Sequence, residues 1–251
     1  LSEAHVKEAF IDGGWLNHPA DPERQVVMGV DWGGGDAEDA SSTVVTVAEI
    51  TNEGNMEVIR KEFFEHGMTP AEEVQRIERY INTFDVDTIV VDEGHGAAKR
   101  SGLQTASMTE ADEGFDNVYG CQYGNVKNKE GITWNTKGKK KRYFTVNRTF
   151  MIEEMVEDFK RGNIKIRGDD LDFSERNSNG TRIIRELTAP YTDKVTTPDG
   201  KNKLRVKSDM KDDAFHSLVF AWVAWKHANS TRTLKQIGSH NRRGYEDDDW
   251  F

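Results

Sequence analysis

The sequence predicts an α/β fold in which a mixed β-sheet, made of an antiparallel meander plus parallel strands, is flanked by helices. Three observations predict it. Short apolar runs rich in β-branched residues alternate with amphipathic helical segments, two of these runs end directly at an aspartate, and glycines follow both aspartates. A turn-rich stretch at Thr197–Gly200 predicts an added β-hairpin, with arms at Arg182–Leu187 and Leu204–Val206.

The meander is expected from the first three apolar segments, Val26–Val30, Thr43–Ile50 and Met56–Phe64. The first is apolar throughout, as a central strand buried on both faces is. The second is rich in β-branched residues. The turn-forming residues Asn52–Asn55 join it to the third, so these strands should be antiparallel.

A helix is expected to begin at Thr69-Pro70, where a capping hydroxyl precedes a proline at the first helical position. Val74, Ile77, Ile81 and Phe84 follow as one apolar stripe. The strand Asp87–Val91 comes next. A strand, a crossover helix and a second strand normally give parallel strands, so this strand should extend the meander in parallel.

The rest of the chain is expected to add a strand at Val118–Tyr123, a helix at Tyr143–Arg161, a strand at Ile164–Ile166 and a helix from Ser208 or Asp209 to about His227. A buried stripe on the last helix is predicted at Phe215, Leu218, Trp222 and Trp225. Residues 1–24, with a short helix at Ala4–Phe10, form an N-terminal lead-in or linker. Residues 25–229 form the domain, and residues 230–251 a flexible tail.

Composition narrows the classes of function. The chain has 251 residues and begins at Leu1, which suggests excision from a longer polypeptide. Cys121 is the only cysteine, which excludes an internal disulfide framework and a multi-cysteine zinc site. No apolar run approaches the ~18 residues of a membrane span. The net charge of −10 argues against a simple basic DNA-binding module, although acidic metal sites also contribute negative charge.

Two aspartates at strand ends are the main candidates for a functional site. Asp31 and Asp92 each follow an apolar strand, and the carboxyl ends of neighbouring strands are where α/β sheets place ligand groups. Carboxylates held close together repel unless a proton or cation lies between them. Hard oxygen ligands favour Mg²⁺ or Mn²⁺. The simpler interpretation is that both residues form turns.

The last helix offers a third acidic ligand. Asp212 falls at the margin of the buried stripe, from where it could reach the end of the sheet, so we rank it first, Asp213 second and Asp209 third. Asp212 or Asp213 could instead serve only the helix N-terminus. His95 and His216 could assist proton transfer, although a structural or surface role is favoured for both.

A basic segment interrupts this acidic chain. We expect it to contact DNA phosphates, which fix position without reading sequence; the alternative is a solvated loop. Its cations are Lys127, Lys129, Lys137, Lys139, Lys140, Lys141 and Arg142.

Taken together, VVMGVDWGGGDAEDASSTVVTV from position 26, DTIVVDEGHGA from position 87 and KDDAFHSLVFAW from position 211 resemble the acidic motifs of the nuclease domain of tailed-virus terminase large subunits. Arg185-Glu186-Leu187 also fits this family. The resemblance implies an RNase H-like fold and two-metal cleavage of double-stranded viral DNA during genome packaging. Asp31 would then bridge two Mg²⁺ or Mn²⁺ ions, Asp92 would bind one, and Asp212 or Asp213 the other.

The resemblance also implies a cellular context. The partners would be double-stranded DNA, the packaging ATPase domain of the same parent chain, the portal and the small terminase subunit, and the protein would act in the cytoplasm of the infected host cell. The chain departs from the family pattern in having no G-x-x-x-x-G-K-[ST] loop, so ATP hydrolysis would lie outside it.

Three alternatives stay open at this point. Another RNase H-like nuclease, of the resolvase or transposase type, would use the same acids. An actin-like or sugar-kinase ATPase would need a second phosphate loop, which the sequence lacks. A non-enzymatic docking domain of the packaging machine would have no affinity for divalent metal at Asp31 and Asp92.

Overall fold

The structure is a computed structural model, and it describes residues 1–34, 41–93, 99, 102–103, 117–126, 131–135, 143–168, 178–196 and 202–242. The basic segment is largely outside this range, so its seven predicted DNA contacts, Lys127 to Arg142, lie outside the described residues. His95 also lies outside them.

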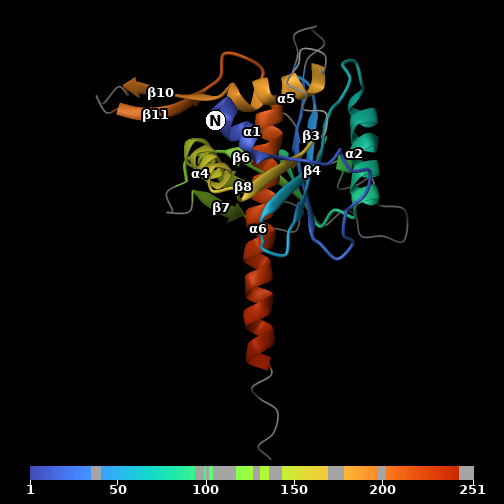
Figure 1. The fold of residues 1–251 in the computed structure, drawn as a ribbon. Helices are drawn as coiled ribbons and strands as arrows, with labels where there is room; N and C mark the ends of the chain where they lie inside the picture. The colour runs from blue at the N-terminus through green and yellow to red at the C-terminus, as the bar shows by residue number, and fades with distance from the viewer. Residues whose placement is uncertain are drawn as a thin grey trace, which may run out of the picture.

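A nine-stranded mixed sheet forms the centre of the molecule (Figure 1). Strands β2, β3 and β4 are antiparallel neighbours, and β5, β6 and β8 continue from β2 in parallel. This arrangement confirms the predicted α/β fold class, with an antiparallel meander and parallel strands in one mixed sheet. In spatial order the strands are β1 (Phe10–Ile11), β9 (Ile164–Arg167), β4 (Met56–Phe63), β3 (Val44–Ile50), β2 (Val26–Asp31), β5 (Thr88–Asp92), β6 (Val118–Tyr123), β8 (Tyr143–Val146) and β7 (Ile132–Asn135).

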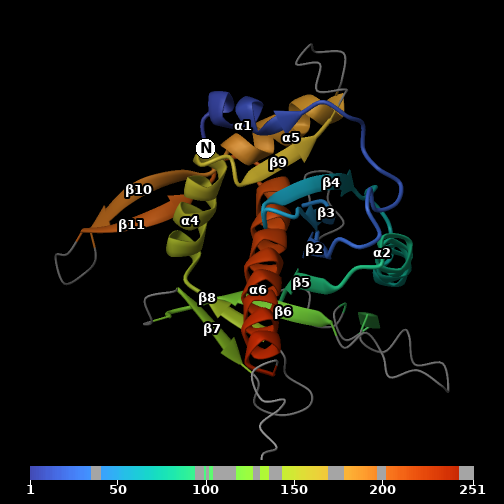
Figure 2. The same cartoon turned by 60° about the horizontal axis from the view of Figure 1, so that its bottom comes forward.

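Helices cover both faces of the sheet, as Figures 1 and 2 show. Helix α2 (Pro70–Phe84) buries Ile77, Ile81 and Phe84 in one apolar cluster, whereas α6 (Asp213–Arg242) packs into a second cluster across the sheet. The remaining described helices are α1 (Glu3–Ala9), α4 (Arg148–Lys160) and α5 (Ser178–Thr188). The hairpin β10 (Tyr191–Thr196) and β11 (Asn202–Lys207) extends from the body.

Local sequence signals explain where α2 begins. Thr69 Oγ1 accepts a hydrogen bond from Glu72 N, and the Glu72 side chain accepts one from Thr69 N, which completes the capping box. Pro70 occupies the first helical position. The crossover from β2 to β5 therefore forms as the sequence predicts, and it makes β5 parallel to β2.

Glycine at position 29 lets α6 lie directly on β2. A Cβ atom built at Gly29 would come within 2.1 Å of both Ala221 N and Ser217 O. The close approach buries the predicted stripe of Phe215, Leu218, Trp222 and Trp225. It also holds the first turn of α6 against the central strand, whose last residue is Asp31.

Four predicted elements differ from the structure. Tyr143–Val146, predicted as the start of a helix, is strand β8, because Asn147 caps α4 after it. Strand β7, at Ile132–Asn135, lies within the segment predicted as a basic loop and pairs with β8. Arg182–Leu187 belongs to helix α5 and is not a hairpin arm; the arms are β10 and β11.

The fourth difference concerns the two ends of the chain. Helix α6 begins at Asp213, later than predicted, and its backbone continues as helix to Arg242. At the other end, the predicted lead-in contributes α1, which buries Val6 and Ala9, and β1, which pairs with β9. In the described part of the chain, no helix has both the length and the apolar character that crossing a bilayer requires.

Candidate metal centre at the carboxyl ends of two parallel strands

Asp31 and Asp92 lie side by side at the same edge of the sheet. Val30 is in register with Val91 across the parallel β2–β5 pair, so the next residue on each strand is one of the two aspartates. Side chains alternate along a strand. Asp31 therefore points to the same face as Gly29, which is the face that α6 covers. By the same register, Asp92 points to that face too.

The N-terminus of α6 brings two more carboxylates to this edge. Asp213 is buried, and its Oδ2 accepts a hydrogen bond of 2.9 Å from Ser42 N. Asp212 precedes the helix, and its carbonyl accepts the first-turn bond from His216 N. Predicted residues from three distant parts of the chain are thus gathered at one end of β2 and β5.

The pKa of Asp31 reports how closely these acids interact. Burial is the largest cause that raises this pKa well above its usual value, and the charges of Asp213, Asp92 and Asp212 raise it further, in that order. Only Lys61 opposes the shift among the causes identified. Asp31 is thus the central carboxylate of the cluster, and Asp213 has a larger effect on it than Asp212 does.

Asp213 and Asp212 have different surroundings. Burial, followed by the charges of Glu186 and Asp212, raises the pKa of Asp213 despite its hydrogen bond from Ser42. For Asp212, burial opposes ionisation, but a hydrogen bond from His216 and the charges of His216 and Arg148 lower its pKa overall. Asp212 is therefore paired with His216 and Arg148, whereas Asp213 lacks such a partner and its charge has the larger effect on Asp31.

This contrast reverses our ranking of the two residues, so we now expect Asp213 to be the third ligand. Asp209, ranked third, is exposed, and its carboxylate accepts hydrogen bonds from Tyr191 Oη at 3.0 and 3.1 Å.

Several residues that support the cluster were not predicted as site residues. Glu186 Oε2 accepts a hydrogen bond of 2.8 Å from Ala214 N, and so serves a free amide at the start of α6. Its other oxygen accepts one from Arg182, which also bonds the Ser42 hydroxyl. The Arg185-Glu186-Leu187 motif fits the family that the sequence resembles, but nothing in the motif indicates that Glu186 would contact α6.

A buried lysine lies behind the acids. Lys61 Nζ donates to Thr46 Oγ1, Ala214 O and Ser217 Oγ at 2.5, 2.8 and 3.0 Å. Burial lowers the pKa of Lys61 to about 7, against the opposing charges of Glu186 and Asp31. This residue supplies positive charge under the carboxylates from within the protein.

His216 connects the cluster to two further side chains. Its Nδ1 lies 2.7 Å from Tyr123 Oη, and its Nε2 lies 3.0 Å from an Arg148 nitrogen and 3.3 Å from Asp212 Oδ2. Burial and the charge of Cys121 raise the pKa of Tyr123, so the phenol stays protonated. His216 therefore positions Asp212.

The donor set fits a hard divalent cation. All four candidate ligands offer carboxylate oxygens, and a cation would relieve the unfavourable burial and repulsion at Asp31. As the side chains stand, no three His, Cys, Asp or Glu residues of the described ranges form a group that could hold one ion. Binding would therefore require the carboxylates of Asp213 or Asp212 to turn from their present partners toward Asp31.

Comparisons with known proteins show which solved structures have a similar fold. No protein-family model matches the sequence, and no curated protein matches it. Among solved structures, the large terminase nuclease from thermophilic phage G20c is similar with a TM-score of 0.52 and 14% identity, covering 86% of this chain and 94% of that one.

The same nuclease with bound magnesium gives a TM-score of 0.53 and 16% identity over 86% of this chain and 93% of that one. The structure of that nuclease with bound cobalt gives a TM-score of 0.53 and 15% identity, over 88% of this chain and 95% of that one. At these identities the likeness concerns the fold, and it extends over most of both chains. In its fold, this protein resembles phage large terminase nuclease domains.

Proposed function

We propose that this chain is a divalent-metal-dependent endonuclease that cleaves double-stranded DNA. The observation that carries the proposal is that Asp31, Asp92 and Asp213 lie at one edge of the sheet, where Asp31 is partly buried and surrounded by like charges. Such a cluster is costly without a cation. The fold shared with the phage nuclease, whose structures hold magnesium or cobalt, supports the same conclusion.

Each acid has a distinct role in this proposal. Asp31 is the central ligand and would bridge two ions, while Asp92 would hold one ion and Asp213 the other. Asp212 would stay with His216 and Arg148, and Asp213 would exchange its hydrogen bond from Ser42 for the metal. When bound, a pair of Mg²⁺ or Mn²⁺ ions activates water and stabilises the leaving oxygen of a phosphodiester.

Two other groups maintain the site. Glu186 holds the start of α6, which fixes the position of Asp213 relative to β2. The buried ammonium of Lys61 offsets part of the negative charge from below. We expect both to position the ligands without touching DNA.

We also propose that the nuclease works in viral genome packaging. Its substrate would be viral DNA, and its partners would be the packaging ATPase domain of the parent chain, the portal and the small terminase subunit. The work would take place in the cytoplasm of the infected host cell.

Plasmid cleavage tests the activity. Supercoiled DNA is incubated with wild-type protein, Asp31→Asn or Asp213→Asn, each with Mg²⁺, Mn²⁺ or EDTA. We expect nicked and linear products from the wild type with metal. The cleavage rate of each variant should be at least about a hundredfold lower, because each variant lacks a proposed metal ligand.

Asp209→Asn is the matched control, because Asp209 is an exposed acid close in sequence but bonded to Tyr191. It should cut like the wild type. Equal cutting by wild type and Asp31→Asn would attribute the activity to another site or to a contaminant.

Metal binding separates the enzyme from a docking domain. Mg²⁺ or Mn²⁺ should raise the Tm of the wild type, because a ligand that binds only the folded state stabilises it, and should leave Asp31→Asn unchanged. A wild-type Tm that does not respond to either metal would favour the docking domain.

A further inference from the structure

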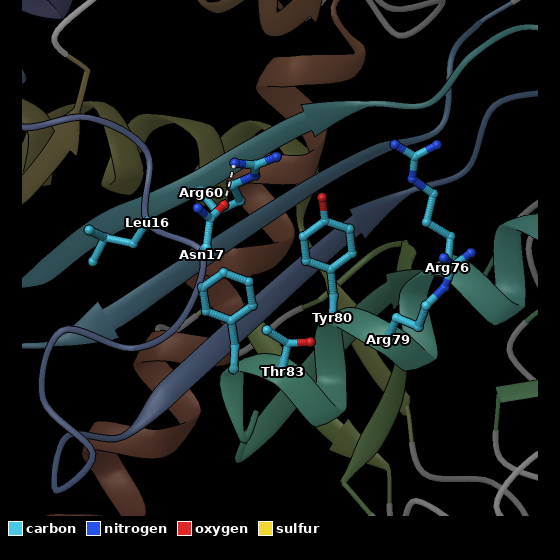
Figure 3. Close-up of a pocket in the computed structure, with 8 residues that line it drawn as sticks. Leu16, Asn17, Arg60, Arg76, Arg79, Tyr80 and Thr83 are labelled. Atoms are coloured by element: carbon cyan, nitrogen blue, oxygen red, sulfur yellow. Dashed lines mark hydrogen bonds between the residues drawn. The ribbon is translucent and has the colours of Figure 1, made fainter.

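A polar pocket lies on the opposite face of the sheet from the carboxylates of the candidate metal centre. Its cavity of about 240 Å³ is formed by the segment before β2, by β4 and by α2. Figure 3 shows Arg60 on β4 beside Asn17, with Arg76 and Arg79 next to each other on α2, on the other side of Tyr80 from Arg60 in this view. Leu16 and Phe84 complete an apolar wall.

A β-bulge places the strand residues of this pocket. Val47 pairs with Arg60 and Ala48 pairs with Val58, so Ile59 is an extra residue on β4. An extra residue reverses which side chains face each side of the sheet. After the bulge, Arg60 and Glu62 face α2, whereas Lys61 faces α6 and the acidic cluster. The pocket and the candidate metal centre thus share one strand but open on different faces.

Positive charge exceeds negative charge in the pocket. Glu62 accepts hydrogen bonds from Arg60, Arg76 and Tyr80, and its side chain is 13% exposed. Arg79 is exposed and makes no ion pair or hydrogen bond within the described ranges. Among the residues that the structure describes, three guanidinium groups are therefore balanced by one carboxylate, in a protein with a net charge of −10.

Arg60, which lines the pocket, also has an unsatisfied donor. Arg60 Nε is buried and has no hydrogen-bond acceptor among the described residues. A buried donor without a partner is costly, so an acceptor supplied by a ligand would be favourable. Guanidinium groups match phosphate oxygens with paired, directional hydrogen bonds.

We infer that this pocket binds a nucleotide through its phosphate, with the sugar or base against Tyr80, Leu16 and Phe84. A terminal phosphate carries about −1.5 to −2 charges at pH 7, which matches the excess of two positive charges. The cavity of about 240 Å³ is smaller than the roughly 300–1,000 Å³ of typical small-molecule sites, so it would enclose the phosphate and part of one nucleotide, either free or at the end of a DNA strand.

The choice of a nucleotide over an acidic peptide follows from Glu62. This carboxylate already occupies the inner donors of Arg60 and Arg76. A further carboxylate would bring one charge to the remaining donors, whereas a phosphomonoester brings more charge and three acceptor oxygens.

Calorimetric titration tests the inference with metal removed by EDTA, so the result does not depend on cleavage. The probes are a deoxynucleoside 5′-monophosphate, inorganic phosphate, and a short single-stranded oligonucleotide with either a 5′-phosphate or a 5′-hydroxyl. We expect the nucleotide and the phosphorylated oligonucleotide to bind more tightly than phosphate or the 5′-hydroxyl strand. Equal affinity for the mononucleotide and the phosphorylated strand identifies a free nucleotide, and a tighter strand identifies a DNA end.

Variants assign the binding to the pocket. Arg79→Gln and Arg60→Gln should each weaken the binding about tenfold, the effect of losing one charge-assisted hydrogen bond. Arg161→Gln, an exposed arginine at the end of α4, is the matched control and should bind like the wild type. Asp31→Asn should also bind normally, which separates this pocket from the metal centre.

Three results would overturn the inference: no measurable binding of either phosphorylated probe, unchanged binding by Arg79→Gln, or tighter binding of an oligoglutamate peptide than of the nucleotide. Because Arg60 also bonds Glu62, the fold of its variant is checked by thermal unfolding, and exposed Arg79 gives the cleaner measurement.

Discussion

Single residues in this protein show how a site can be built from groups that are unfavourable alone. Asp31 lies among three other aspartates, and Lys61 is buried beneath them. Burial opposes the charged form of both residues, but with opposite effects on pKa: it raises that of Asp31 and lowers that of Lys61 to about 7. The contributions of Asp31 and Lys61 to the free energy of unfolding therefore change with pH in opposite directions.

We predict that Asp31→Asn stabilises the metal-free protein at neutral pH by about 1 kcal/mol or more. The folded-state pKa of Asp31 is raised above the unfolded value of about 3.9. Its contribution is thus fully present below that value and is lost as the pH rises through the folded-state pKa. Urea unfolding in EDTA from pH 4 to 8 should show the wild type losing stability relative to the variant. Parallel pH profiles would contradict a buried, repelled carboxylate.

Lys61→Met should give the opposite trend. The folded-state pKa of about 7 lies below the unfolded value of about 10.4, so between them the unfolded chain binds more protons. The free energy of unfolding of the wild type should then rise relative to the variant from pH 7 to 9, by up to about 1.4 kcal/mol per pH unit. The same urea series measures it, and a flat difference would mean that Lys61 stays charged throughout.

At the level of elements, the site depends on how closely α6 lies on β2. Gly29 permits the contact, and Glu186 from α5 satisfies the first amide of the helix. Both interactions are tertiary. Helix α6 therefore begins at Asp213, although the apolar stripe by itself is compatible with an earlier start.

Gly29→Ala tests this packing. Its new Cβ would lie within 2.1 Å of backbone atoms of α6, and backbone cannot yield as a flexible side chain can. We expect a loss of about 1–3 kcal/mol in urea unfolding, the usual cost of overpacking, together with a weaker rise in Tm on adding Mg²⁺. Gly34→Ala is the control, because a Cβ there meets no atom of the described residues within 4 Å. Equal stability of the two variants would show that α6 can shift without cost.

For the whole molecule, the net charge of −10 bears on how the proposed nuclease would hold DNA. Metal ions at the proposed centre would supply positive charge only locally. The predicted DNA contacts of the basic segment lie outside the described residues and stay a prediction. They concern Lys127, Lys129, Lys137, Lys139, Lys140, Lys141 and Arg142.

Replacing these seven residues by glutamine should flatten the salt dependence of DNA binding. Each phosphate contact on a duplex contributes about −0.9 to the slope of log K against log salt concentration, so loss of all seven contacts would remove roughly six units. Fluorescence anisotropy with a short duplex in Ca²⁺ or EDTA at several salt concentrations measures the slope. An unchanged slope would exclude the segment from the DNA interface.

Patterns within short stretches of sequence determined much of this protein. Apolar and β-branched runs predicted the positions of β2, β3 and β4, and an apolar stripe predicted that of α2. The two apolar strands that end at an acid predicted that Asp31 and Asp92 would lie together. These signals are local, because burial on both faces, capping and crossover handedness act over a few residues or one connection.

Only the tertiary structure decided which acid of the Asp212-Asp213 pair acts more strongly on Asp31, since that depends on Glu186, Ser42 and His216. It also decided that Lys61 lies under the acids and Arg60 in the opposite pocket, because one bulge reverses the faces of β4. No short sequence pattern predicts either arrangement, because each depends on contacts between segments far apart in sequence.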